Sequence, residues 1–208
     1  SEIHPFNIGL AAIRALEPAG IVLSGGPASC YDEDAPQIDA GIFELGVPVL
    51  GICYGMQTMA AELGGKVEAS EHREFGYAEI TPGDSGLFGG FSDADSGKPM
   101  LKVWMSHGDR VEAVPPGFAV TASSPNSPIA AMEDAQRKFY GVQFHPEVTH
   151  TLHGDAMMRR FVREICGCPG DWTAGNIVAD AIEQVRAQVG DGQVLLGLSG
   201  GVDSSVVA

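Results

Sequence analysis

The sequence predicts an α/β fold with a mainly parallel central sheet, flanked by helices and joined to a small antiparallel subsheet. Residues 20–23 and 47–50 are short apolar segments with β-branched side chains, which is typical of buried strands. Helix-forming segments follow them at residues 35–45 and 58–63, so strand and helix alternate as they do in parallel sheets. Beyond residue 66 the pattern changes to strands and turns, which favours antiparallel pairing.

The remaining elements follow from the same local patterns. Between residues 66 and 110 we expect short strands at 75–80 and 101–105, and a surface excursion at 82–99 because that segment is rich in Gly, Asp and Ser. We also expect a helix at 7–17, an antiparallel pair at 118–123 and 129–132, a strand at 139–144, a helix at 154–165, a linker at 166–175, a helix at 176–189 and a buried strand at 193–198.

Composition limits the class of protein. The 208 residues are 44% hydrophobic and 19% charged, enough for one domain and part of a second. A net charge of −15 argues against general affinity for nucleic acid or anionic membrane, since both need a basic surface. No apolar run reaches the roughly twenty residues that span a bilayer, so we expect a cytoplasmic protein. The cysteines Cys30, Cys53, Cys166 and Cys168 are too few for a disulfide scaffold and lack the spacing of a zinc site, so no metal site is expected.

Cys53 lies in a sharp turn between a predicted strand and a predicted helix. Gly51 and Gly55 flank it, and small residues are needed where the chain bends tightly and the helix packs close to the strand. The turn exposes the sulfur at a helix N-terminus, where free N–H groups and the helix dipole favour a thiolate. The sequence therefore predicts a nucleophilic cysteine rather than a buried structural one.

A base for this cysteine follows the predicted strand at 139–144. His145 and Glu147 are two residues apart in an extended segment, so their side chains can lie side by side, and Pro146 stiffens the backbone between them. One imidazole nitrogen can then face the thiol while the other donates to Glu147. His107 also follows a strand, but its position favours a substrate-wall residue or a surface histidine over a base.

Two glycine-rich turns follow predicted strands. Residues 24–27 (Ser-Gly-Gly-Pro) can direct N–H groups at a negatively charged oxygen, although such a turn by itself is more often a plain tight turn. Residues 199–205 (Ser-Gly-Gly-Val-Asp-Ser-Ser) follow the predicted strand at 193–198. Their N–H groups can converge on phosphate oxygens.

These segments carry a family resemblance. Residues 24–27, 51–57 and 145–147 resemble the oxyanion, nucleophile and His-Glu motifs of class I glutamine amidotransferases, over residues 20–166. Residues 196–205 resemble the pyrophosphate loop of N-type ATP pyrophosphatases. The resemblance implies the class I glutamine amidotransferase fold, without the family's first strand. It also implies a glutaminase domain at 1–168 and, at 169–208, a linker, a helix and the start of an ATP pyrophosphatase (synthetase) domain, truncated after the phosphate loop.

The resemblance also implies roles for single residues in glutamine hydrolysis. Cys53 would attack the side-chain amide of glutamine, and the N–H groups of Gly26 and Tyr54 would stabilise the oxyanion. His145 would protonate the departing ammonia and later activate water against the thioester, while Glu147 holds His145 in place. Glutamine and ammonia would therefore be the substrate and first product of this site, with no cofactor needed.

Further substrates are implied for the intact protein. Gln57, Ser106 and His107 correspond to glutamine-binding positions. Ammonia would reach the protein's own synthetase domain, where ATP adenylylates xanthosine monophosphate and ammonia displaces AMP. Magnesium and residues of the phosphate loop would hold the pyrophosphate of ATP, namely Ser199, Gly200, Gly201, Val202, Asp203, Ser204 and Ser205. We expect a homodimer for the full-length protein.

Other functions share parts of these motifs. An amidotransferase for another acceptor, such as those of the anthranilate, aminodeoxychorismate or carbamoyl phosphate pathways, lacks the appended pyrophosphatase loop. A γ-glutamyl hydrolase shares the cysteine turn. A binding or regulatory module with the same fold usually lacks the cysteine or the histidine, and both Cys53 and His145 are present here.

Overall fold

The computed structural model describes residues 1–30, 32, 35–95, 97–170 and 174–195. The chain divides into two compact units, Ser1–Cys168 and Pro169–Ala208, which we describe separately. The boundary coincides with the end of the predicted glutaminase domain. The assignment of the two units to a glutaminase and a synthetase domain stays a prediction.

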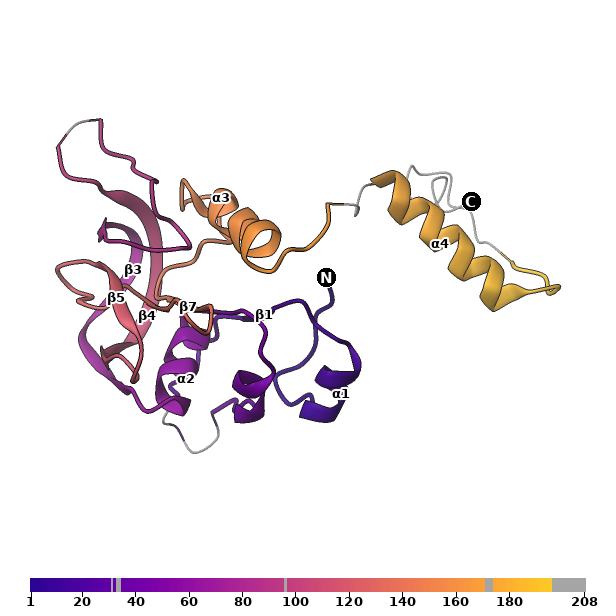
Figure 1. Cartoon of the computed structure of the whole chain (residues 1–208), viewed down its shortest axis with the longest axis horizontal. Helices are drawn as coiled ribbons and strands as arrows, with labels where there is room; N and C mark the ends of the chain where they lie inside the picture. Colours follow the sequence, from indigo (N-terminus) through magenta and orange to yellow (C-terminus); the bar gives the residue numbers. More distant parts are fainter. Residues whose placement is uncertain (31, 33–34, 96, 171–173, 196–208) are drawn as a thin grey trace. The chain divides into compact units, whose positions relative to one another are not determined.

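Within the described residues, the first unit contains one seven-stranded mixed sheet, in the order β1-β2-β7-β6-β5-β3-β4 (Figure 1). β1, β2 and β7 pair in parallel, and the other neighbours pair antiparallel. The α/β sheet is therefore present, with an antiparallel part larger than the sequence indicates. The strands are β1 Ile21–Leu23, β2 Val49–Ile52, β3 Lys66–Pro82, β4 Leu101–Ala113, β5 Ala119–Ser123, β6 Ala131–Asp134 and β7 Phe139–Val142.

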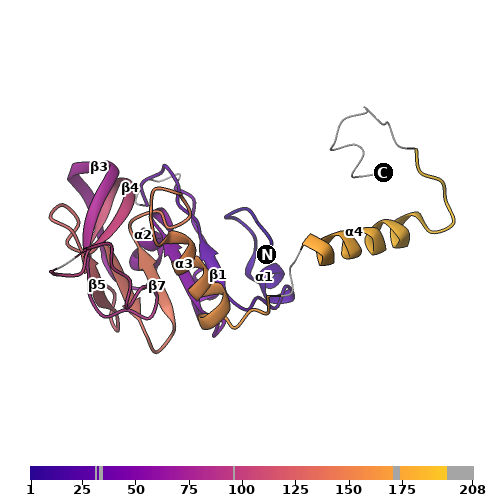
Figure 2. The same cartoon turned by 90° about the horizontal axis from the view of Figure 1, so that it is seen from above.

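Helices cover both faces of the parallel strands. Successive strand residues point to opposite faces, and Leu50 packs with Met157 and Phe161 while Val49 packs with Met56 and Met59. The helix at residues 54–62 (α2) therefore lies on one face, and the helix that begins at residue 154 (α3) lies on the other (Figure 2). The helices of the first unit are α1 Leu10–Ala15, a 3₁₀ helix η1 Ala40–Glu44, α2 Tyr54–Glu62, α3 Gly154–Arg159 and a π-helix η2 Arg160–Ile165, which continues α3.

The antiparallel part differs most from the prediction. In place of short strands and turns, β3 and β4 form one long hairpin, with a register shift between Ala69 and Glu74 that local sequence does not reveal. The segment that joins them is more than a surface excursion. Leu87 and Phe88 are each only 1% exposed and belong to the core. Burial of these two apolar side chains anchors the otherwise polar loop to the sheet.

Two predicted helices are shorter than expected. The segment at 35–45 is helical only in η1, since Asp39 caps the backbone N–H of Gly41 and so fixes a late start. The helix at 7–17 is reduced to α1, which buries no side chain. The helix at 154–165 is confirmed by α3 and η2 together.

In the second unit, α4 spans Ala174–Val189. It begins two residues before the predicted helix at 176–189 and ends at the same residue. The buried strand predicted at 193–198 is wrong where the structure describes it, since residues 193–195 form no strand and Leu195 is 99% exposed. The described part of this unit contains no other strand with which it could pair. Residues 196–198 lie outside the described residues.

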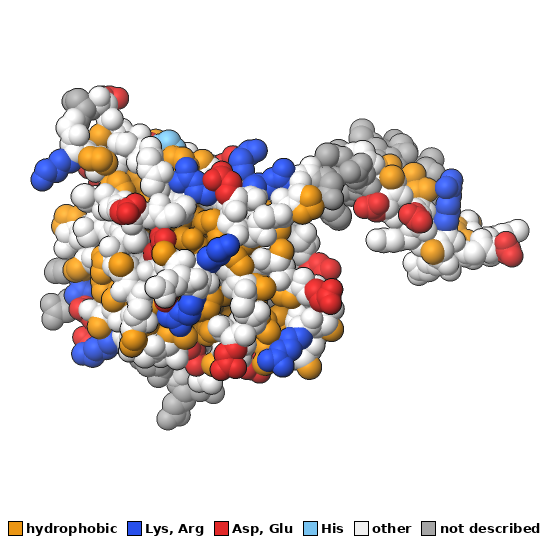
Figure 3. All heavy atoms as spheres, in the orientation of Figure 1, with side chains coloured by type: hydrophobic (Ala, Val, Ile, Leu, Met, Phe, Trp, Pro, Cys, Tyr) orange, Lys and Arg blue, Asp and Glu red, His pale blue; other side chains and the backbone are white. Residues whose placement is uncertain are grey.

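On the face shown in Figure 3, acidic and basic side chains of the first unit alternate with hydrophobic ones, and no single-sign basic patch is visible. This agrees with the net charge of −15. A membrane-crossing helix, long and apolar enough for the purpose, is absent from the described ranges.

Candidate active site

Three predicted motifs meet at one edge of the sheet. The turn at 24–27 follows β1, Cys53 follows β2, and His145 lies three residues after β7. Since β1, β2 and β7 are neighbouring parallel strands, their carboxyl ends lie together. Ligands of parallel sheets bind at this edge. The sheet topology therefore assembles residues that are far apart in the sequence.

The turn around Cys53 depends on glycines. A Cβ on Gly55 would lie 2.2 Å from the carbonyl oxygen of Leu23, and one on Gly51 would lie 2.7 Å from the backbone of Gly55. Only glycine permits such close packing of α2 on the strands. Cys53 itself has φ +50° and ψ −108°, a conformation that non-glycine residues rarely adopt. The sharp turn predicted between strand and helix, which we call the cysteine elbow, is therefore present in the backbone.

Hydrogen bonds of both the backbone and the side chain fix Cys53. Its backbone N–H donates to the carbonyl oxygen of Val142 at 2.8 Å, which anchors the turn to β7. The thiol Sγ donates to the carbonyl oxygen of Ser106 at 3.4 Å, and the side-chain Nε2 of Gln143 donates to Sγ at 3.7 Å. Cys53 is only 3% exposed. The sulfur thus lies in a site with both an acceptor and a donor.

His145 and Glu147 form the predicted pair. The imidazole Nδ1 lies 2.7 Å from Glu147 Oε1. The other ring nitrogen, Nε2, is buried and makes no hydrogen bond with any residue that the structure describes. Cys53 is adjacent, since a Cβ on Gly25 would lie 3.0 Å from His145 Cε1 and 3.6 Å from Cys53 Cβ. The structure therefore brings the three predicted residues together.

The electrostatics of this group favour a charged imidazole. The neighbouring Cys53 sulfur and the Glu147 carboxylate, in that order, raise the pKa of His145 to about 10 against the opposing effect of burial. Burial is the largest single effect and acts to raise the pKa of Glu147, but the hydrogen bond with His145, a backbone hydrogen bond and the charge of His145 together lower it. A thiol beside such a base can transfer its proton to the imidazole.

The backbone of His145 is held by a neighbour that the sequence did not single out. The His145 N–H donates to the carbonyl oxygen of Trp104 at 2.9 Å. Thr151 is 3% exposed, and its hydroxyl donates to the carbonyl oxygen of His145 at 2.6 Å and accepts from the N–H of Trp104 at 3.1 Å. These bonds fasten the segment after β7 to β4.

The turn at 24–27 lies beside the cysteine elbow. Gly25 adjoins both Cys53 and His145, and a Cβ on Gly26 would lie 3.6 Å from the ring of Tyr54. Tyr54 is the first residue of α2, so its N–H has no acceptor within the helix. The two predicted oxyanion donors, Gly26 and Tyr54, are therefore neighbours next to the sulfur.

The predicted glutamine-binding residues lie close to this site, in different settings. The carbonyl of Ser106 faces the Cys53 sulfur. Gln57 is 3% exposed, and its Nε2 donates to the carbonyl oxygen of Asp109 and to Oε1 of Gln143. The side-chain nitrogen of Gln57 therefore already has protein partners.

His107 is a buried histidine, which contradicts the surface alternative. Its side chain contacts Glu74 Oε2 through Nε2 at 3.1 Å and the carbonyl oxygen of Asp109 through Nδ1 at 3.0 Å. Burial lowers the pKa of His107 although Glu74 opposes the shift. The long hairpin β3–β4 buries this residue, and that hairpin was not evident from the sequence.

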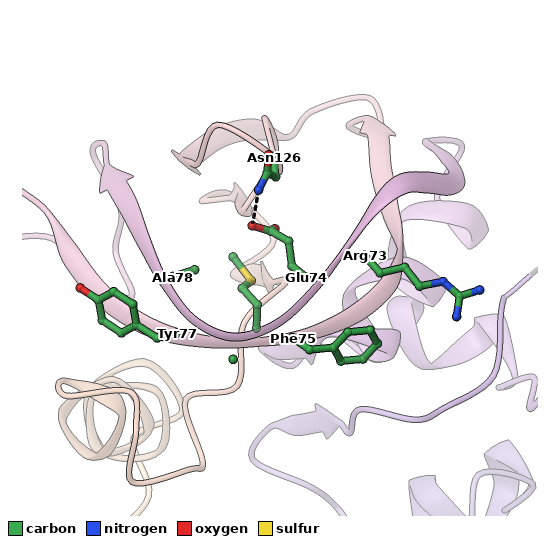
Figure 4. Close-up of a pocket in the computed structure, with 8 residues that line it drawn as sticks. Arg73, Glu74, Phe75, Tyr77, Ala78 and Asn126 are labelled. Carbon is green, nitrogen blue, oxygen red and sulfur yellow. Dashed lines mark hydrogen bonds between the residues drawn. The ribbon is translucent and has the colours of Figure 1, made fainter.

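A hollow along β3 lies next to the Glu74–His107 pair (Figure 4). Glu74 points toward Asn126, whose Nδ2 donates to Glu74 Oε1 at 3.3 Å. The side chains that line this hollow do not include Cys53, His145 or Glu147. They are Arg73, Glu74, Phe75, Gly76, Tyr77, Ala78, Met105 and Asn126.

The predicted ATP-binding residues, 199–205, lie outside the described residues, so their arrangement stays a prediction. Within the part of the chain that the structure describes, no cluster of three or more His, Cys, Asp or Glu side chains could hold a metal ion.

Gln143, like Thr151, is a residue of the site that the sequence did not predict. The sequence predicts it only as part of the strand at 139–144. A signal was available, because Gln143, His145 and Glu147 alternate in an extended segment and Gln143 is the one polar residue between Phe139 and Phe144 that lacks an aromatic ring. Its side chain is completely buried.

The sequence resembles curated proteins over its whole length. Glutamine-hydrolyzing GMP synthase of Azoarcus sp. (strain BH72) is 59% identical over 213 residues, and that of Aromatoleum aromaticum is 60% identical over 210 residues. Each alignment covers 100% of this chain and 40% of the relative. The chain therefore spans less than half the length of these relatives.

Solved structures and a family profile agree on the fold. A candidate GMP synthase subunit from Thermoplasma acidophilum has a TM-score of 0.65 at 29% identity, covering 88% of this chain and 84% of its own. A glutamine amidotransferase of Thermotoga maritima, 24% identical with a TM-score of 0.54 and covering 86% and 68%, supports the fold alone. The profile described as Glutamine amidotransferase class-I matches residues 1–165, most of the chain. The chain belongs to the class-I glutamine amidotransferase family.

Proposed function

We propose that this chain is the glutamine-hydrolysing part of a GMP synthase, and that Cys53, His145 and Glu147 are its catalytic triad. The observation that carries the proposal is the cysteine elbow beside the His145–Glu147 pair, whose Nδ1–Oε1 distance is 2.7 Å. The curated relatives are named glutamine-hydrolyzing GMP synthase, which supports the pathway.

In the first step, the Cys53 thiol transfers its proton to His145 Nε2 and the thiolate attacks the amide carbon of glutamine. The raised pKa of His145, about 10, supports an imidazolium at neutral pH. Nδ1 remains bonded to Glu147, which fixes the ring and offsets its charge.

The oxyanion that forms would be stabilised by the N–H groups of Tyr54 and Gly26. Loss of one such donor commonly costs about 2.7–4 kcal/mol of transition-state stabilisation. His145 then protonates the leaving ammonia, a thioester forms on Cys53, and water activated by His145 releases glutamate.

Glutamine would bind between the turn at 24–27 and β4. Ser106 contributes through its backbone carbonyl, which lies 3.4 Å from the sulfur. For Gln57 and His107, whose side-chain nitrogens contact protein groups, we propose contributions through backbone and shape.

The ammonia would serve a second site in the full-length protein. There we propose that ATP with Mg²⁺ adenylylates xanthosine monophosphate and that ammonia displaces AMP to give GMP. Residues 199–205 would hold the pyrophosphate through their backbone N–H groups. A homodimer of the full-length protein belongs to the same proposal.

The decisive experiment compares Cys53→Ala with wild type in the full-length gene product. We expect the variant to lose glutamate release from glutamine, with or without ATP and xanthosine monophosphate, and to keep GMP synthesis from added ammonia. Cys168→Ala is a matched control, since Cys168 lies outside the site and should leave both activities unchanged.

Each outcome bears on a different part of the proposal. Glutamine-dependent turnover in Cys53→Ala would exclude the nucleophile assignment. Loss of both activities in a folded variant would contradict two separate sites. Hydrolysis of γ-glutamyl peptides by the wild type, without GMP synthesis, would favour a γ-glutamyl hydrolase.

A further inference from the structure

Two buried amide side chains lie behind the sulfur of Cys53. Gln57 belongs to α2, which follows the turn, and Gln143 follows β7, the strand that pairs with β2. They are 3% and 0% exposed, respectively. Buried amides are costly unless their donors and acceptors are used. Their contacts therefore show how each is oriented.

A chain of hydrogen bonds joins these amides to the sulfur. The Nε2 of Gln57 donates to the carbonyl oxygen of Asp109 at 2.8 Å and to Oε1 of Gln143 at 3.3 Å. The Nε2 of Gln143 in turn donates to Sγ of Cys53 at 3.7 Å. The chain thus runs from the backbone of β4 to the proposed nucleophile.

The backbone carbonyl sets the direction of the whole chain. A carbonyl oxygen can only accept, so the group of Gln57 that faces Asp109 must be its NH₂. The same nitrogen faces Gln143, which must then present its oxygen. The remaining NH₂ of Gln143 is therefore directed at the sulfur, and no choice of amide orientation is left open.

When Cys53 loses its proton to His145 Nε2, as proposed above, the thiolate is stabilised further by a second hydrogen-bond donor besides the charged imidazole. As a thiol, Cys53 donates to the carbonyl oxygen of Ser106 at 3.4 Å. As a thiolate it cannot donate, and the same carbonyl dipole faces a negative charge. A donor to an ionised acceptor forms a stronger hydrogen bond than one to a neutral acceptor, especially in a buried site. Gln143 can supply it without a change of position.

We infer that Gln143 is a catalytic residue that stabilises the Cys53 thiolate through Nε2–H, and that Gln57 is a positioning residue that holds the Gln143 amide in this orientation. The inference rests on the proposed role of Cys53 as nucleophile. It gives Gln57 a role behind the sulfur, in addition to its predicted role at the glutamine site.

The test follows the alkylation of Cys53 by iodoacetamide in the full-length gene product as a function of pH. Only the thiolate reacts, and mass spectrometry of the peptide that contains Cys53 separates it from the other cysteines. In Gln143→Met, which keeps the chain length but lacks the donor, we expect the midpoint of the rate profile to rise by about 1–2 pH units. Gln57→Met should shift it in the same direction by a smaller amount.

Gln136→Met is the matched control, because Gln136 is exposed in the turn before β7 and its midpoint should equal that of wild type. An unshifted midpoint in folded Gln143→Met would overturn the inference, since a purely structural role would change only the unfolding temperature. If Gln143→Met does not fold, Gln57→Met decides, because it leaves Gln143 in place. An unshifted midpoint there also contradicts the inference.

The alkylation profile does not depend on glutamine turnover. If Cys53→Ala retained glutamine hydrolysis, the proposed function would fail even with a shifted midpoint in Gln143→Met. If Cys53→Ala lost hydrolysis and the midpoint of Gln143→Met stayed unchanged, only the inference about Gln143 would fail.

Discussion

At the residue scale, the site consists of a sulfur, an imidazole and a carboxylate held by backbone geometry. The positive φ of Cys53 and the 2.7 Å contact between His145 and Glu147 are the two features that chemistry requires. The carboxylate and the sulfur both raise the pKa of His145. The charged imidazole therefore depends on two neighbours, and removal of either one has a predictable sign.

Glu147→Gln should move the alkaline limb of glutaminase activity to lower pH. The carboxylate helps to raise the pKa of His145 to about 10, so its loss lowers that pKa, and the imidazolium proposed to protonate ammonia is depleted at lower pH. We also expect kcat to fall by up to about 10²–10⁴-fold, the range of general acid–base contributions. Profiles of kcat against pH measure both effects.

Glu62→Gln, at the exposed end of α2, is the control and should reproduce the wild-type profile. An alkaline limb unchanged in Glu147→Gln would show that Glu147 does not set the pKa of His145.

At the element scale, close packing between α2 and the parallel strands determines the shape of the site. Gly55 lies against the backbone of Leu23 in β1, and Gly51 lies against Gly55. The helix cannot approach the sheet this closely with any larger side chain at these positions. The turn that carries Cys53 is therefore a consequence of helix–sheet packing as well as of local sequence.

Gly55→Ala should destabilise the protein and disturb the site together. The added Cβ would lie 2.2 Å from the carbonyl oxygen of Leu23, which is backbone and cannot rotate away. Overpacking of this kind costs about 1–3 kcal/mol or more. Urea unfolding and the rate of Cys53 alkylation measure the two effects.

Gly9→Ala is the control, since nothing lies within 4 Å of its added Cβ. Wild-type stability in Gly55→Ala would mean that α2 can shift without cost, contrary to the packing described.

At the scale of the whole molecule, ionisable groups whose pKa values are shifted in opposite directions give the stability of the first unit opposite dependences on pH. His107 has a lowered pKa because of burial, so its contribution is lost as pH falls below the ordinary value of 6.5. The pKa values of Glu147 and Asp134 are also lowered, so the stability that these carboxylates contribute is lost as pH falls further, through the acidic range. His145 has a raised pKa, so its contribution is complete below 6.5 and is lost as pH rises through about 10.

We therefore expect the unfolding temperature to be highest near neutral pH and to fall on both sides. His107→Gln should flatten the decrease between pH 7 and pH 5, roughly the range in which an unfolded histidine gains its proton. His4→Gln is the control, because His4 is exposed. Calorimetry over this range measures the slopes, and an equally steep acid decrease in His107→Gln would contradict the assignment.

The motifs, and the chemistry predicted for them, follow from local sequence. Cys53 between glycines, and His145 two residues before Glu147, have local meanings that follow from turn geometry and strand alternation. For the same reason β1, β2 and β7 could be predicted to within two residues at each end, whereas α2 begins four residues before the helix predicted at 58–63. These inferences concern residues that are neighbours in the sequence.

The surroundings of these motifs become apparent only in the folded chain. The long β3–β4 hairpin buries His107, and Leu87 and Phe88 enter the core from a polar loop. The contacts of Gln143 with Cys53 and of Thr151 with His145 join elements through the order of strands in the sheet. Such contacts depend on strand order and register, which are set by the burial of side chains distant in the sequence and not by local pattern.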